Sequence, residues 1–265
     1  MDVDARIEQS LWDLFWLPAW ASVVDRPGVL YTHSDRDQHA LNQVLRVRGP
    51  VEDLPEIVAE VDHAHQGVCS RWLLCRDSQL PALPPLLLRH GWMPEHRHHV
   101  RAARVARLHV PPSPGVTVRA VEDAATLRDC IAVCDAAFDR GFEAVSEARL
   151  ADELGQLGRA DAQVHRFVAY DGVSGRPMAS GGLNTFPALG VGFLWGGGTL
   201  PELRRRGAYR AVVAARLERA REVGCDLVGV YARVDSSDPV MAALGFERHG
   251  TMVSWSRPAD YAHGP

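Results

Sequence analysis

The sequence predicts an α/β protein with two domains, each a mixed sheet flanked by helices. Its 265 residues exceed the usual length of one domain, and 46% of them are apolar, enough for a substantial core. Strand and helix patterns alternate along the whole chain. Between them, residues 110–115 (Val-Pro-Pro-Ser-Pro-Gly) exclude a helix and disfavour a central strand. We therefore expect domains at 1–110 and 116–265, joined by a linker at 111–115.

The N-terminal half shows helix and strand patterns in mixed order. Apolar spacing from Leu11 to Val24 predicts an amphipathic helix interrupted at Pro18. Strand patterns occur at 28–32, 41–47, 71–75 and 98–105. Helical patterns occur at 51–65 and 80–90, the second with a proline near its start. This mixture indicates a sheet with helices packed against it.

The C-terminal half has a more regular pattern. Strands are predicted at 116–120, 164–170, 177–186, 191–200, 227–234 and 249–255. Helices are predicted at 127–138, 146–157, 207–223 and 237–244, where apolar residues recur at helical spacing. The expected order of elements is therefore βααβββαβαβ.

Charge and cysteine content exclude several classes of protein. With 29 Lys+Arg against 33 Asp+Glu, the net charge of -4 is too acidic for a protein that coats nucleic acid. The N-terminus is acidic and the apolar stretch at 15–24 is short, so we expect neither a secretory signal nor a membrane span, and a cytoplasmic location. Five cysteines, most of them in apolar stretches, indicate reduced and buried thiols.

The two halves show a weak internal repeat. A constant offset of 154 residues brings His90-Gly91-Trp92 onto Leu244-Gly245-Phe246, each at the end of a helix pattern that follows a strand pattern. The repeat would make the halves two copies of one fold. Two unrelated α/β domains are the alternative that the sequence leaves open.

The segment that points to chemistry is 196–210, Gly-Gly-Gly-Thr-Leu-Pro-Glu-Leu-Arg-Arg-Arg-Gly-Ala-Tyr-Arg, between a predicted strand and a predicted helix. Its glycines can expose strand backbone to a ligand and often mark a bulge. The amides that open the helix lack partners within it, and together with the helix dipole they favour a phosphate group. An ordinary helix start on a solvated basic turn is the alternative.

Residues 204–209, Arg-Arg-Arg-Gly-Ala-Tyr, resemble the pyrophosphate-binding signature of the GNAT N-acetyltransferase superfamily, Arg/Gln-x-x-Gly-x-Gly/Ala. Arg204 and Gly207 match, whereas Tyr209 stands where the family usually has a small residue. Leu200-Pro-Glu, Ala243-Leu-Gly-Phe246 and the element order extend the likeness over 116–257. The N-terminal half is then similar to a degenerate GNAT copy, because acidic residues at 49–55 replace a phosphate turn.

The resemblance implies acetyl-CoA as co-substrate, whose acetyl group passes to a primary amine by direct attack on the thioester. Strands 191–200 and 227–234 would splay apart to admit the thioester. The implied cofactor-binding residues fall into a strand edge that pairs with the pantetheine arm, a signature arginine, and amides that hold the pyrophosphate. They are Gly198, Thr199 and Leu200; Arg204; and Arg205, Arg206, Gly207, Ala208, Tyr209 and Arg210.

The implied reaction needs a base for the amine and a proton donor for the leaving thiolate. Many relatives place a tyrosine four residues before the Gly-Phe pair, but Met241 stands there and cannot donate a proton. Ser237 or Tyr231 could donate instead, or thiolate release could need no side-chain acid. Candidates for the base, placed by the resemblance along the border of the acceptor cleft, are Glu143, Asp139 and His165.

A non-catalytic acyl-CoA-binding regulatory module is the main alternative, and a nucleotide-binding protein is a third. A metal site is not expected, because His90, His96, His98 and His99 fit no zinc spacing. The expected partners are a coenzyme A thioester and an unidentified amine, not nucleic acid or a membrane. The sequence leaves the oligomeric state open, a homodimer included.

Overall fold

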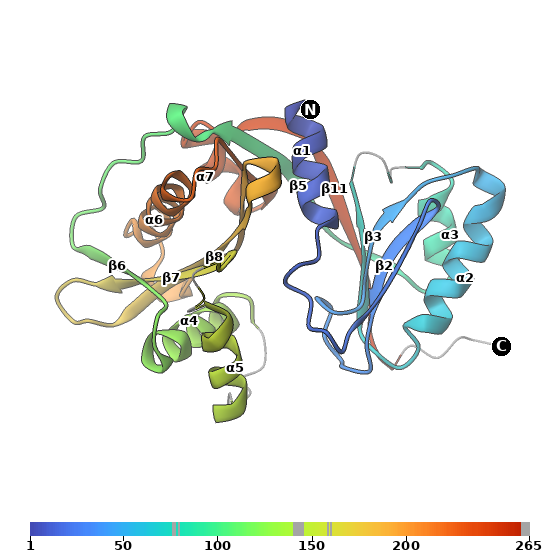
Figure 1. Ribbon diagram of the computed structural model, residues 1–265, viewed down its shortest axis with the longest axis horizontal. Coiled ribbons are helices and arrows are strands. Elements are labelled where there is room, and N and C mark those ends of the chain that lie inside the picture. The colour runs from blue at the N-terminus through green and yellow to red at the C-terminus, as the bar shows by residue number, and fades with distance from the viewer. Residues whose placement is uncertain (76–77, 79, 140–145, 158, 160, 261–265) are drawn as a thin grey trace. The chain divides into compact units, whose positions relative to one another are not determined.

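The computed structural model of the chain (Figure 1) describes residues 1–265 except 76–77, 79, 140–145, 158, 160 and 261–265. The chain forms two compact units. Unit 1 comprises residues 1–7, 102–230 and 242–247, and unit 2 comprises residues 8–101, 231–241 and 248–265. Three strands, β5, β10 and β11, contribute residues to both units.

The sheet of unit 1 has the strand order β10-β9-β8-β7-β6. These strands are β6 (Val116–Ala120), β7 (Val164–Asp171), β8 (Pro177–Phe186), β9 (Val191–Thr199) and β10 (Leu227–Arg233). Strands β6 to β9 pair antiparallel, whereas β10 runs parallel to β9. A parallel neighbour requires a crossover, which α6 (Ala208–Glu222) provides.

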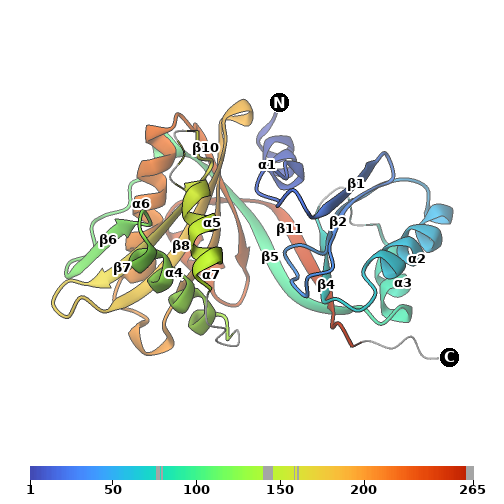
Figure 2. The same ribbon diagram turned by 60° about the horizontal axis from the view of Figure 1, so that its bottom comes forward.

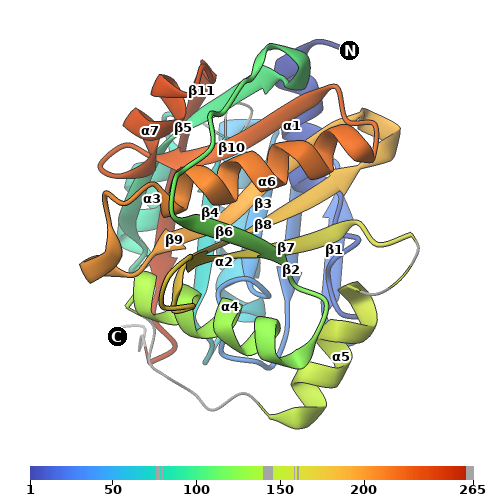
Figure 3. The ribbon, with the colours of Figure 1, turned by 90° about the vertical axis from the view of Figure 1, so that its left-hand side faces the viewer.

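Helices cover both faces of this sheet. Figure 1 shows α6 on one side of β7 and β8, with α4 (Ala124–Ala137) and α5 (Glu147–Leu157) on the other; Figure 3 shows α6 lying across the strands. Helix α4 begins at Asp123, which accepts a hydrogen bond from the Thr126 amide in a capping box. Leu127, Ile131 and Val168 form part of the core between α4 and the sheet.

The sheet of unit 2 has the strand order β1-β2-β3-β4-β11-β5. Its strands are β1 (Ser22–Arg26), β2 (Val29–His33), β3 (Gln43–Val47), β4 (Ser70–Leu74), β11 (Glu247–Arg257) and β5 (Met93–Arg104). Strands β1 to β3 form an antiparallel meander, β3 is parallel to β4, and β4 pairs antiparallel with β11.

The main core of unit 2 lies under α2 (Leu54–Ala64) and α3 (Leu83–Arg89), which pack together on one face of the sheet (Figure 2). Trp72 and Trp92 meet there edge to face, with ring centroids 5.7 Å apart. A second cluster on Leu30, Leu45 and Met252 includes Trp12 at the end of α1 (Val3–Trp12). The short helix α7 (Ser237–Ala243) precedes β11.

From β6 to β11 the elements follow the order that the sequence predicts. The N-terminal prediction is wrong in one place, because residues 22–26 form strand β1 where we expected helix. The helix lies earlier, at Val3–Trp12, and β1 is stabilised by pairing with β2 from Ser22↔His33 to Arg26↔Val29. Pairing with a neighbour therefore overrides the local apolar spacing.

The two compact units also differ from a simple split at 111–115. Residues 248–257 of β11 belong to unit 2, because they pair with β4 from Val253↔Leu74 to Arg257↔Ser70. That residues 1–110 and 116–265 are two copies of one fold stays a prediction. Among the described residues no helix is both long and apolar enough to cross a bilayer. All five cysteines are free thiols, and three are buried.

Buried histidines predict a loss of stability in acid. Burial lowers the pKa of His65, His98 and His165 to about 4 from an ordinary 6.5. The unfolded chain therefore binds more protons than the folded chain between pH 6.5 and 4, so the unfolding free energy falls as the pH falls through this window. His65, which is 1% exposed, accounts for up to about 3 kcal/mol of this fall in unfolding free energy, at about 1.4 kcal/mol per pKa unit.

Urea unfolding followed from pH 7 to pH 4 measures this slope. His65 Nε2 donates to the Thr32 carbonyl at 2.8 Å, and His65→Gln keeps a donor there while removing the titrating ring. The variant should show a shallower pH dependence than the parent protein. Equal slopes for both proteins would show that His65 is not the titrating group.

Candidate functional site

Strand β9 is interrupted by a bulge at its glycines. The pairing of β8 with β9 shifts between Ser180↔Gly198 and Gly182↔Trp195, which leaves Gly196 and Gly197 opposite Gly181. Gly196 has a φ of +57°, a conformation that side chains disfavour. The glycine run therefore marks a bulge, as the sequence predicts.

Beyond the bulge, the backbone N–H and C=O groups of β9 point alternately toward β8 and away from it. The Leu200 amide donates to the Met178 carbonyl at 2.9 Å, so it is already used on the side of β8. Backbone groups of successive residues point to opposite sides of a strand, so those of Thr199 point away from β8. Of the three residues predicted on this edge, Thr199 is therefore the one best oriented to pair with a ligand.

The parallel pairing of β9 with β10 is short. It runs over four residue pairs and ends at Leu194↔Val230, although β9 continues to Thr199. The last five residues of β9 thus extend past this ladder. This end of the pairing is where the resemblance predicts that the two strands separate.

The turn between β9 and α6 has an unusual backbone. A 3₁₀ turn at Pro201–Leu203 leads to Arg204 in an extended conformation, followed by Arg205 with a φ of +66°. Such a φ is uncommon for a residue with a side chain, and strained residues cluster at ligand-binding turns. Gly207, with a φ of +82°, is the N-cap of α6.

The amides of this turn face no acceptor within the described part of the chain. No recorded hydrogen bond uses the N–H groups of Arg205, Arg206 or Gly207, and the first bond of α6 runs from Ala211 N to Gly207 O at 3.0 Å. The first amides of the helix lack partners by geometry. Open amides at a helix start, with arginines next to them in the sequence, are an arrangement that favours a phosphate group.

Ser113 of the proline-rich segment lies against this turn. Its hydroxyl donates to the Gly207 carbonyl at 3.0 Å, and a Cβ on Gly207 would come within 3.0 Å of Ser113 Oγ. Sequence reasoning placed 111–115 as a linker and gave it no contact. The structure shows instead that Ser113 of this segment contacts Gly207 directly.

Tyr209, the departure from the family signature, lies against β9. A Cβ on Gly197 would approach the ring to 2.9 Å, so the ring fills the space that this glycine leaves open. The ring centroid is 6.0 Å from the guanidinium carbon of Arg216, two turns further along α6. The aromatic ring therefore lies near both Gly197 of β9 and the guanidinium of Arg216.

The candidate proton donors, Ser237 and Tyr231, lie in unit 2. Ser237 Oγ accepts a hydrogen bond from the Arg233 amide at 2.9 Å, and its own proton stays available for donation. Tyr231 Oη accepts from Cys75 Sγ at 3.7 Å, and burial raises the Tyr231 pKa well above its ordinary value. The phenol is therefore protonated at neutral pH. Met241, which replaces the tyrosine of many relatives, is fully buried.

The candidate bases differ in their positions. Glu143 lies outside the described residues. Asp139 follows α4, is exposed and has a φ of +52°. His165 Nδ1 on β7 accepts a hydrogen bond from Arg219 Nε at 3.4 Å. Arg219 lies in the last turns of α6, about 16 Å along the helix from Ala208. Burial lowers the pKa of His165 to about 4, so its ring is a weak base.

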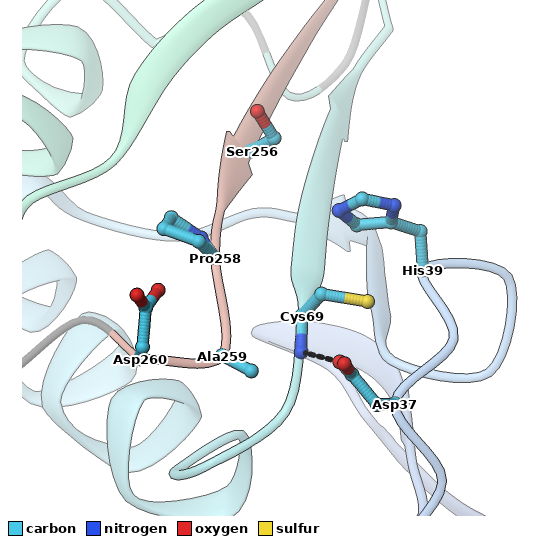
Figure 4. A pocket seen from close by; sticks show the side chains of 7 residues that line it. All are labelled: Asp37, His39, Cys69, Ser256, Pro258, Ala259 and Asp260. Atoms are coloured by element: carbon cyan, nitrogen blue, oxygen red, sulfur yellow. Dashed lines mark hydrogen bonds between the residues drawn. The ribbon is translucent and has the colours of Figure 1, made fainter. Parts of the chain in front are cut away.

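Unit 2 has a cavity of its own, with a volume of about 490 Å³. Figure 4 shows Asp37, His39 and Cys69 gathered on one side of it. Asp37 Oδ1 accepts from the Cys69 amide at 2.6 Å, and burial together with this carboxylate raises the pKa of the Cys69 thiol to about 12. A protonated thiol is a poor nucleophile, so this group does not form a cysteine–histidine catalytic pair.

Among the described residues, no three His, Cys, Asp or Glu side chains are grouped to hold a metal ion.

Residues 130–246, which include the bulge, the turn and α6, match the acetyltransferase (GNAT) family. No protein of curated function shows significant sequence similarity to the chain.

Several solved structures share the fold over nearly the whole chain. A GCN5-related N-acetyltransferase from Kribbella flavida has a TM-score of 0.72 at 22% identity, covering 97% of this chain and 96% of that one. A GCN5-related N-acetyltransferase from Sphaerobacter thermophilus has a TM-score of 0.60 at 16% identity, covering 95% and 85%. A tandem GNAT protein from the clavulanic acid biosynthesis pathway has a TM-score of 0.56 at 15% identity, covering 97% and 88%.

Proposed function

Because residues 130–246 match the acetyltransferase (GNAT) family, we propose that this chain is an acetyl-CoA-dependent N-acetyltransferase acting on an unidentified primary amine. The observation that carries the proposal is the turn at 204–208. Its amides at Arg205, Arg206 and Gly207, which face no acceptor among the described residues, suit the diphosphate of coenzyme A, as do its arginines and the positive φ of Gly207. The proposed cofactor-binding set is the one predicted from the sequence, from Gly198 to Arg210.

In the proposed arrangement, the diphosphate on the turn directs the pantetheine arm along β9. The backbone of Thr199 pairs with the arm as a neighbouring strand would. The thioester then lies beyond Leu194↔Val230, where the recorded ladder with β10 ends. Holding both reactants in this position converts a bimolecular step into one within a complex, which is the largest expected contribution to the rate.

The proposed reaction transfers the acetyl group from the thioester sulfur to the amine nitrogen. The neutral amine attacks the thioester carbonyl, the C–N bond forms, and the negative charge that develops on the carbonyl oxygen is stabilised by a backbone amide of β9. The C–S bond then breaks as the carbonyl re-forms. The ammonium proton goes to a base or to solvent, and coenzyme A leaves as a thiolate that takes up a proton.

Ser237 and Tyr231 stay the proposed donors of that proton, and Glu143 stays a proposed base. Both donors carry a proton at neutral pH, the hydroxyl of Ser237 by its chemistry and the phenol of Tyr231 by its raised pKa. Ser237 is the stronger candidate, because its oxygen already accepts a hydrogen bond from the Arg233 amide, an interaction that fixes its position.

The competing function is that of a non-catalytic module that binds acyl-CoA and regulates a partner. Burial of Met241 in place of a tyrosine is the observation that favours it. Such a module would bind coenzyme A as tightly as an enzyme but would not release it from the thioester.

Release of free thiol from acetyl-CoA, measured with a panel of amines, separates the two. At least one amine should raise thiol release above the rate of acetyl-CoA hydrolysis. The panel should include small polyamines, amino sugars, peptide N-termini and lysine side chains. Tight binding of acetyl-CoA without thiol release for any amine would favour the regulatory module, and the absence of binding would contradict both functions.

A further inference from the structure

Arg216 is an unusual residue for the core of unit 1. It lies in the middle of α6, is 1% exposed, and faces the sheet beside Val212 and Val213. No carboxylate among the described residues forms an ion pair with it; burial lowers its pKa, and Tyr209 opposes this shift. A buried guanidinium without a carboxylate is costly to maintain. Such a residue calls for a role that an apolar side chain could not fill.

The guanidinium of Arg216 binds the backbone at the bulge. Nη1 donates to the carbonyl of Gly182 on β8 at 3.2 Å and to the carbonyl of Trp195 on β9 at 3.4 Å. Gly182 and Trp195 are the last pair before the register of the two strands shifts. One cationic group thus joins both strands at the point where β9 bulges.

The neighbouring glycines make room for this contact. A Cβ on Gly181 would lie 3.0 Å from Arg216 Cζ, and a Cβ on Gly197 would lie 3.3 Å from Nη2. A side chain at either position would push the guanidinium away from the carbonyls. The glycines of β8 and β9 and the arginine of α6 therefore form one structural device.

The contact with the Trp195 carbonyl also determines where the next amide points. The described backbone has no cis peptide bonds, and in a trans peptide the N–H points opposite to the C=O. Since the Trp195 carbonyl faces Arg216, the Gly196 N–H points away from α6. A cationic donor on the carbonyl also polarises the peptide and makes its N–H a stronger donor.

We propose that Arg216 is a positioning residue that clamps the β9 bulge and thereby aims and polarises the Gly196 amide as the oxyanion donor for the thioester carbonyl. This inference rests on the proposed acetyl transfer. Arg216 itself touches neither substrate. It acts through the peptide that joins Trp195 to Gly196.

The test compares Arg216→Met, Arg216→Lys and a control, Arg219→Met, which removes a half-exposed arginine three residues further along the same helix. Arg216→Met should lower kcat about tenfold to a hundredfold, in the range of a weakened oxyanion donor. The KM for acetyl-CoA should change much less, because the phosphate-binding turn is intact. Arg216→Lys keeps a cation and should recover part of kcat, while Arg219→Met should match the parent protein. All variants are assayed below their melting temperatures.

A second readout does not depend on activity. Amide resonances of Gly196 and Gly197 in the ligand-free protein should shift in Arg216→Met and less in Arg216→Lys, but not in Arg219→Met. A folded Arg216→Met protein with parental kcat, or with unshifted glycine amides, would overturn the clamp. If the parent protein binds no acetyl-CoA, the proposed function fails, and the glycine resonances still decide whether Arg216 holds the bulge.

Discussion

Gly207→Glu is expected to abolish measurable binding of coenzyme A. The substitution places a carboxylate among the amides of Arg205, Arg206 and Gly207, where the diphosphate is proposed to lie. It also forces a side chain into a position with a φ of +82° and brings its Cβ within 3.0 Å of Ser113 Oγ. Repulsion of the phosphates and displacement of Ser113 act in the same direction, so we expect affinity to fall by more than about a hundredfold.

Gly207→Ala is the matched control for Gly207→Glu. It carries the same backbone strain, about 1–2 kcal/mol for a left-handed residue, without the charge. Titration calorimetry should therefore show weakened but measurable binding for Gly207→Ala. Arg204→Ala should weaken binding less than Gly207→Glu, because most phosphate contacts come from backbone amides. Equal affinity of Gly207→Glu and the parent protein would remove the turn from the cofactor site.

Asp62→Ala is expected to cost the most stability of any single change proposed for unit 2. Asp62 on α2 is 5% exposed and accepts hydrogen bonds from Trp92 Nε1 at 2.9 Å, His90 Nδ1 at 2.6 Å and the guanidinium of Arg257. Arg257, at the end of β11, is 3% exposed and stacks on Trp92, with Cζ 4.4 Å from the ring centroid. Removing the carboxylate takes away the ion pair of a buried guanidinium, and losing one partner of a buried ion pair costs about 3–5 kcal/mol.

Urea unfolding of the full chain measures this cost. The double variant Asp62→Leu with Arg257→Leu removes both charges and should be more stable than Asp62→Ala, because the buried cation is removed together with the carboxylate. A loss below about 1 kcal/mol for Asp62→Ala would be in the range of exposed ion pairs and would show that the cluster does not hold β11 in unit 2.

The sequence predicts the elements of 116–257 well because their signals are local. Apolar residues at helical spacing mark α4 and α6, and Gly196 to Gly198 mark the bulge of β9. Strand β1 was not predicted, because Val23 and Val24 suit a helix face as well as a strand. Its pairing with β2 is what makes this segment a strand. The membership of β11 in unit 2 likewise depends on pairing with β4, more than 170 residues away in sequence.

The candidate site was predicted in part. Its backbone cradle follows from a motif at fixed spacing, so Gly207 and its neighbours could be named from sequence. The roles of Ser113 and Arg216 depend on contacts between distant segments, because Ser113 and Gly207 are 94 positions apart in the sequence, and Gly182 and Arg216 are 34 positions apart. One signal for Arg216 was present, since a charged residue stands between Val213 and Leu217 on the apolar face of a predicted helix.

Hydrogen–deuterium exchange of the backbone amides, with and without saturating coenzyme A, tests most directly whether the turn after β9 binds the diphosphate. We expect slower exchange on addition of coenzyme A at 205–210 and around Thr199, with 3′-phospho-AMP protecting the turn less and Thr199 not at all. Unchanged exchange at 205–210 in the presence of bound coenzyme A, or protection confined to another part of the chain, would contradict the assignment of this site.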